Sequence, residues 1–124
     1  MSLNRDDLRE RNTVAIKALE LSVMQLRKLR KGKTLTIRKR YQREIARAIE
    51  EITDLELING HLKASDTTVE PMSASVQSTL DDLAGRLDEA IRSDFILNAA
   101  FETVLDVISF AEEIGAIVDS HVHA

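Results

Sequence analysis

Apolar residues recur every three or four positions along the first half of this chain, a spacing that places them on one face of an α-helix. A first helix is expected from residue 4 to about residue 31, with Asn4 as its N-cap. A second is expected to begin at Thr34 or Thr36 and to end at Asn59-Gly60. Gly32 separates the two, because glycine adopts the left-handed conformation that ends a helix at little cost. The pattern therefore predicts a helical hairpin over residues 4–59.

The second half of the chain predicts two more helices after a linker over residues 60–72. Pro71 suits the first position of a third helix over residues 71–92. A fourth helix is expected over residues 94–120, where apolar residues outnumber those that one face needs. A helix with so broad an apolar face is expected to be the most buried one or to form part of an oligomer interface.

The connection between the third and fourth segments leaves two folds open. Apolar positions from Val76 to Ala111 keep one heptad frame, which only Asp94 interrupts. If the chain turns at Ser93-Asp94, the fold is an all-α, antiparallel four-helix bundle. If it does not, one helix spans the stretch, and a three-helix arrangement would dimerise as a coiled coil. We favour the bundle, because a continuous helix of about 75 Å would extend past its partners unless it dimerised.

Length and composition indicate one folded domain over residues 1–124, with 44% hydrophobic and 31% charged residues. The absence of cysteine excludes disulfides and zinc–thiolate sites. The first residues lack the apolar core of a secretory signal. The most apolar stretch, residues 95–118, contains four acidic residues, which argues against a transmembrane span. We therefore expect a cytoplasmic protein.

Charge is distributed very unevenly along the chain, although the net charge is only −4. Residues 27–43, which we call the basic tip, contain nine bases and no acid, whereas residues 44–124 contain four bases and 17 acids. The nine bases are Arg27, Lys28, Arg30, Lys31, Lys33, Arg38, Lys39, Arg40 and Arg43. Three of them fall in the first turns of the second helix, where the helix dipole is already positive and cations are unfavourable. The basic tip is either a solvated hairpin end or a binding site for an anionic partner.

Motifs for catalysis and cofactor binding are absent from the sequence. The chain has no Gly-rich phosphate loop, no nucleophile motif and no Glu-x-x-His pair of the kind that binds a di-iron centre. His61 lies in the predicted linker, while His121 and His123 lie at an end that we expect to be frayed and unable to preorganise a metal site. We expect no catalytic residue, no metal and no cofactor.

The first functional hypothesis is therefore a non-enzymatic interaction or assembly module that self-associates, most simply as a dimer, through the third and fourth helices. The interface residues it predicts are Phe95, Phe101, Ile108, Phe110, Ile114 and Ile117. The alternative is an anion-binding module that contacts nucleic acid or an acidic protein through the basic tip. In the basic tip only Tyr41 could stack on a base, and only Leu35 and Ile37 could enter a membrane.

Overall fold

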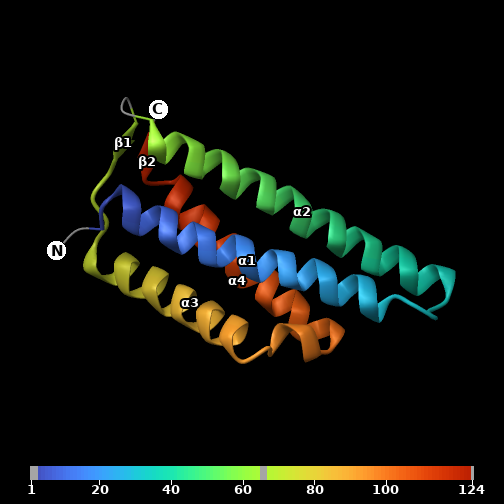
Figure 1. Cartoon of the computed structure of the whole chain (residues 1–124). Helices are drawn as coiled ribbons and strands as arrows, with labels where there is room; N and C mark the ends of the chain where they lie inside the picture. The colour runs from blue at the N-terminus through green and yellow to red at the C-terminus, as the bar shows by residue number, and fades with distance from the viewer. Residues whose placement is uncertain (1–2, 65–66, 124) are drawn as a thin grey trace.

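The computed structural model describes residues 3–64 and 67–123, and in this part of the chain the fold is all-α with one small sheet (Figure 1). The helices are α1 (Arg5–Leu29), α2 (Leu35–Lys63), α3 (Ala74–Arg92) and α4 (Phe101–Asp119), with a short 3₁₀ helix, η1 (Ile96–Asn98), before α4. The strands are β1 (Thr68–Val69) and β2 (Val122–His123). None of the described helices is long and apolar enough to cross a membrane.

The two inner helices of the fold are α1 and α4. Each packs against all three other helices, while α2 and α3 lie on the outside (Figure 1). All four helices contribute residues to one cluster of buried apolar side chains. The inner position of α4 explains its broad apolar face, because neighbours cover it on several sides within a single chain.

The hairpin of α1 and α2 follows the sequence prediction closely at its start and its turn. Asn4 forms a capping box with Asp7, in which each side chain accepts a hydrogen bond from the other residue's backbone N–H. Gly32 has a positive φ of 77°, as the turn requires. Thr34 is the N-cap of α2, although its side chain makes no capping hydrogen bond.

The predicted end of α2 at Asn59-Gly60 is wrong, since the helix continues to Lys63. Leu62 is only 1% exposed, and its burial outweighs the cost of about 1 kcal/mol for a glycine inside a helix. Asn59 is therefore not a terminal cap. Its Oδ1 accepts a hydrogen bond from Nδ2 of the fully buried Asn12 at 3.0 Å, which fixes the register of α1 against α2.

The predicted linker over residues 60–72 contains β1, which pairs antiparallel with β2 near the end of the chain. The expectation of a frayed end is thus wrong for Val122 and His123, which the backbone pairing fixes. The third helix begins at Ala74 instead of residue 71, because Ser73 caps it by accepting a hydrogen bond from the N–H of Val76 at 3.2 Å. Met72, which precedes this cap, is buried.

The chain breaks at Ser93-Asp94, which contradicts a continuous third and fourth helix. The helix α3 ends at Arg92, and Asp94 has a positive φ of 57°. The fourth helix, however, begins at Phe101 instead of residue 94, because η1 and an extended Ala99 come first. The side chain of Gln25 donates a hydrogen bond to the carbonyl oxygen of Ala99 at 2.7 Å, which holds this extended backbone against α1.

The α1–α2 hairpin is longer than the rest of the molecule, so that its turn projects past the α3–α4 connection (Figure 1). The helix α2 has 29 residues, while α3 and α4 have 19 each, a difference of about 15 Å in length. At the α3–α4 connection, Nζ of Lys28 lies 3.5 Å from the carbonyl oxygen of Leu97. Every residue from 31 to 40 is exposed to solvent.

Candidate anion-binding site

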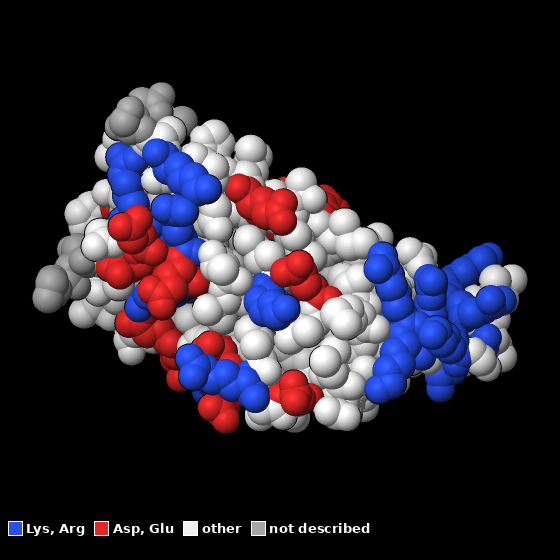
Figure 2. Space-filling model, viewed as in Figure 1, with Lys and Arg blue, Asp and Glu red and all other residues white. Residues whose placement is uncertain are grey.

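The basic tip occupies the projecting end of the hairpin. Its nine bases come from the last turn of α1, the turn around Gly32, and the first turns of α2. On the face that Figure 2 displays, Lys and Arg side chains gather at this end with no acidic side chain among them. The structure therefore brings together in space the charges that are clustered in the sequence.

Few interactions within the chain neutralise this charge. Among the described residues, Arg40 is the only one of the nine bases with an ion pair, to Glu102 of α4 at 3.2 Å. Its guanidinium also lies over the ring of Phe101, 4.7 Å from the centroid. Arg30 donates a hydrogen bond to Oε1 of Gln42, which is uncharged. The other cations in this region remain available to an external anion.

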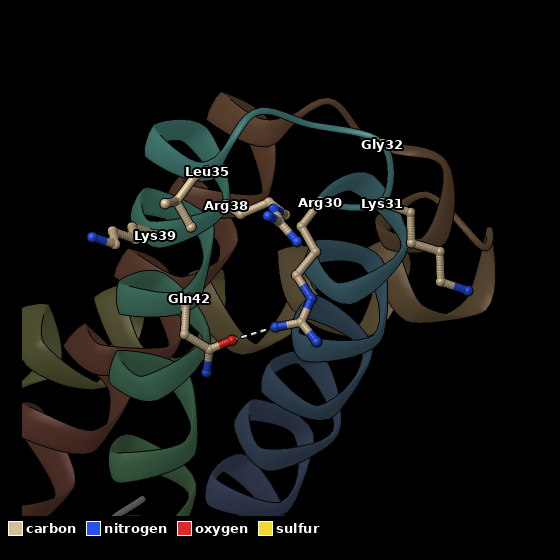
Figure 3. A pocket seen from close by; sticks show the side chains of 7 residues that line it. All are labelled: Arg30, Lys31, Gly32, Leu35, Arg38, Lys39 and Gln42. Carbon is tan, nitrogen blue, oxygen red and sulfur yellow. Dashed lines mark hydrogen bonds between the residues drawn. The ribbon is translucent and has the colours of Figure 1, made fainter.

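A shallow groove of about 440 Å³ lies between the end of α1 and the start of α2 (Figure 3). Its lining residues are Arg30, Lys31, Gly32, Leu35, Arg38, Lys39 and Gln42. The side chain of Thr34 leaves the first backbone N–H groups of α2 uncapped, and they lie at the positive end of the helix dipole. Backbone and side chains thus both favour an anion at this end of the molecule.

Tyr41 is not available to stack on a base, contrary to the role that the sequence left open for it. Its side chain is 9% exposed, and its ring stacks on that of Phe101 with 4.2 Å between the centroids. The contact joins α2 to the start of α4 and marks where the packed part of the hairpin ends. Beyond it, Leu35 and Ile37 are 59% and 41% exposed.

The residues of the predicted oligomer interface differ in how deeply the structure buries them. Ile108 and Ile114 are fully buried in the chain's own core, so their assignment to an interface is wrong: α4 is an inner helix that packs against all three other helices. Phe101, which packs on Tyr41, is partly buried. Phe110 and Ile117 are also partly buried against the core, and Phe95 is 49% exposed.

A second charged region, not anticipated from the sequence, lies between α2 and α4. Arg47 bonds to Glu112 of α4 and to Glu44, and the hydrogen bond with Glu112 raises the pKa of Arg47 above its ordinary value. One helical turn away, the pKa of Glu51 is raised to about 7, chiefly by burial and in addition by the neighbouring carboxylates of Asp54, Glu112, Asp119 and Glu50. Sequence periodicity could not pair these residues, because the contact depends on how α2 and α4 pack.

His121 and His123 each make a polar contact in the structure. His123 Nε2 lies 2.9 Å from Oε2 of Glu70 and thereby lowers the pKa of that exposed carboxyl group, while His121 Nδ1 lies 2.7 Å from the carbonyl oxygen of Ile117. Both contacts hold the β2 end of the chain against its neighbours. Among the described residues, no group of three or more histidine or acidic side chains is arranged to hold a metal ion.

Fold and site together define a small all-α protein with a strongly basic projecting hairpin. Comparison of the chain with protein-family models, with curated proteins and with solved structures finds no match. Function is therefore inferred from the residues and geometry of the site itself.

Proposed function

We propose that this protein is a non-enzymatic module that binds an anionic partner through the basic tip. The observation that carries the proposal is the cluster of nine cations at the projecting end of the hairpin, with Arg40 as the only described one that has an acidic partner. Like charges held this close repel one another and do not help the fold. An external anion would remove that repulsion and would also satisfy the uncapped start of α2.

The proposal includes an antiparallel four-helix bundle as the body that presents the basic tip. Its support is the short turn between α1 and α2 and the packing of α1 and α4 against all the other helices. The bundle would act as a rigid support, so that the basic tip is offered to a partner in one orientation. The proposal also includes a cytoplasmic location, where the chain would meet nucleic acid and the anionic leaflet of the membrane.

The experiment compares binding to heparin and to a short DNA duplex at ~20 mM salt, where exposed charges are weakly screened. The double variant Arg38→Glu/Lys39→Glu reverses two cations that line the groove, and it leaves Arg40 with its contacts to α4. We expect wild-type protein to bind and the variant to bind at least ~10-fold more weakly, because the variant has fewer cations to pair with phosphate or sulfate groups. For the same reason, binding by the variant should depend less steeply on salt.

The matched control is Lys17→Glu/Lys63→Glu, which changes the net charge by the same amount at two exposed positions outside the basic tip. It should bind almost as well as the wild type. Equal losses in the two double variants would show that only net charge matters and would contradict a local site. If the wild-type protein binds neither polyanion, the basic tip is a solvated turn and not a binding site.

Self-association through α3 and α4 is the second candidate, and it takes the form of a dimer. A groove of about 300 Å³ between these helices favours it, since this groove is lined by Leu87, Ala90, Val107 and Phe110 beside the half-exposed Phe95. Light scattering at tens of micromolar protein should give a dimer mass that persists at ~0.5 M salt, because apolar contacts are not screened. Phe95→Ser should give a monomer, and a monomeric wild type would exclude the candidate.

A further inference from the structure

We propose that the anionic partner of the basic tip is a membrane surface rich in acidic lipid, on which the hairpin docks end-on. The inference rests on the proposed anion binding and adds the identity of the partner. It starts from the composition of the exposed segment over residues 31–40, which contains cations, two threonines, a glycine and two aliphatic side chains but no exposed aromatic ring.

Two aliphatic side chains are exposed among the cations of the basic tip. Leu35 and Ile37 are 59% and 41% exposed, whereas other large apolar residues of α2, such as Leu55, are fully buried. In Figure 3, Leu35 stands at the first turn of α2 beside Arg38 and Lys39. A partner made only of phosphates would gain nothing from exposed aliphatic groups. A lipid surface can bind both kinds of side chain. The cations contact the headgroups, and the apolar side chains enter the boundary with the acyl chains.

The side chains that would read a nucleic acid are missing from the same surface. Proteins hold single strands by stacking bases on exposed aromatic rings. The aromatic ring of the basic tip, Tyr41, is instead covered by Phe101. Gln42, the amide side chain in the groove, accepts a hydrogen bond from Arg30. The basic tip thus offers few groups that could recognise a base. It has nine cations that would attract a negatively charged surface.

Overall charge favours an end-on approach. Residues 44–124 contain 17 acids against four bases, so the body of the molecule is repelled by any anionic surface. The basic tip projects beyond the α3–α4 connection and reaches a flat surface first (Figure 1). Within a Debye length of about 10 Å at 0.1 M salt, a planar surface attracts the projecting end while the acidic body stays farther away.

The test measures co-sedimentation with phosphatidylcholine vesicles that contain or lack phosphatidylserine. Leu35→Ser/Ile37→Ser removes the two aliphatic groups and leaves every charge in place. Ile49→Ser/Leu57→Ser is the matched control, because these residues of α2 are 42% and 62% exposed but lie outside the basic tip. Arg38→Glu/Lys39→Glu serves as the charge variant. Heparin binding and circular dichroism are recorded for each variant.

We expect the wild type to bind only the vesicles that contain phosphatidylserine. The aliphatic variant should bind them roughly 10-fold more weakly while it retains heparin binding and helicity, because the loss of apolar insertion leaves the electrostatic attraction intact. The charge variant should lose about fivefold for each cation removed. The matched control should behave as the wild type.

Two results would overturn the inference while the proposed anion binding stands. The first is binding to heparin or DNA without binding to acidic vesicles, which would assign the basic tip to nucleic acid or to an acidic protein. The second is equal vesicle binding by the aliphatic variant and the wild type, which would leave Leu35 and Ile37 without a role. Failure of the wild type to bind any of the three probes would instead reject the proposed function itself.

Discussion

Gly115 is a residue at which α4 lies close against α2. A Cβ atom at this position would overlap Oε1 of Glu51 and would lie 2.9 Å from Cδ2 of Leu55. A side chain fits there only if Glu51 and the fully buried Leu55 shift. The sequence offered no sign of this contact, because Gly115 lies within a helical apolar pattern and breaks neither the pattern nor the helix.

Gly115→Ala should therefore lower the free energy of unfolding by about 1–3 kcal/mol, the usual cost of forcing an extra group into a packed interface. Gly85→Ala is the control, since nothing lies within 4 Å of the Cβ position in α3. The control should be neutral or stabilising by up to about 1 kcal/mol, because alanine favours helix over glycine. Urea denaturation of both variants checks the difference. Equal effects would contradict close packing at Gly115.

Glu51 makes stability depend on pH. Burial, strengthened by four nearby carboxylates, raises its pKa from 4.5 to about 7, so the folded state binds a proton more tightly than the unfolded state. The contribution of Glu51 to stability is therefore most favourable below pH 4.5, falls as pH rises to about 7, and stays unfavourable above that. Arg47 does not cancel the effect, because it pairs directly with Glu44 and Glu112.

Glu51→Gln should accordingly raise the melting temperature at pH 8 and raise it much less at pH 5, because glutamine carries no charge at either pH. Thermal melts of both proteins across this range provide the measurement. Glu56→Gln is the control, because Glu56 is exposed on the same helix and is not one of the carboxylates that raise the pKa of Glu51. A Glu51→Gln variant that is destabilised equally at both pH values would show that the carboxylate is instead needed by the fold.

At the scale of the elements, the break between α3 and α4 has a local cause and a long-range one. Asp94 has a φ of 57°, the left-handed conformation that ends the α3 segment. The residues that follow do not re-enter an α-helix at once, because Gln25 of α1 binds the extended backbone at Ala99. The sequence located the break, while a contact 74 residues away decided where α4 begins.

Replacement of Asp94 tests whether the break between α3 and α4 depends on the backbone conformation of this residue. Asp94→Gly should be neutral or stabilise by up to about 1 kcal/mol, because glycine adopts a positive φ without strain. Asp94→Val should destabilise by about 1–2 kcal/mol, since a branched side chain is strained in this conformation. Chemical denaturation of the two variants gives the order. If valine were tolerated as well as glycine, the break would not depend on this residue.

At the scale of the whole molecule, charge separation opposes stability and favours binding. The basic tip holds cations at the positive end of α2 and at the far end from most of the acids. Arg38→Glu/Lys39→Glu should raise the free energy of unfolding by about 0.5–2 kcal/mol at low salt, because each acid near a helix N-terminus is favourable. Thermal melts at ~20 mM and ~0.5 M salt check this, and the gain should shrink at high salt. A less stable variant at low salt would contradict this account.

The sequence by itself determined the features that depend on neighbouring residues. Apolar periodicity indicated the helical segments, Asn4 and Gly32 set the start and the turn of the hairpin, and the bases were already clustered within residues 27–43. The physical reason is that helix formation, capping and turn conformation depend on groups within a few residues of each other.

Only the tertiary structure decided which of these features are free to act. It buried Ile108 and Ile114 in the chain's own core, covered Tyr41 with Phe101, and paired β1 with the distant β2. It also left Leu35 and Ile37 exposed on a hairpin that outreaches its neighbours. Exposure and reach depend on the relative lengths and packing of separate helices, and no local pattern in the sequence contains that information.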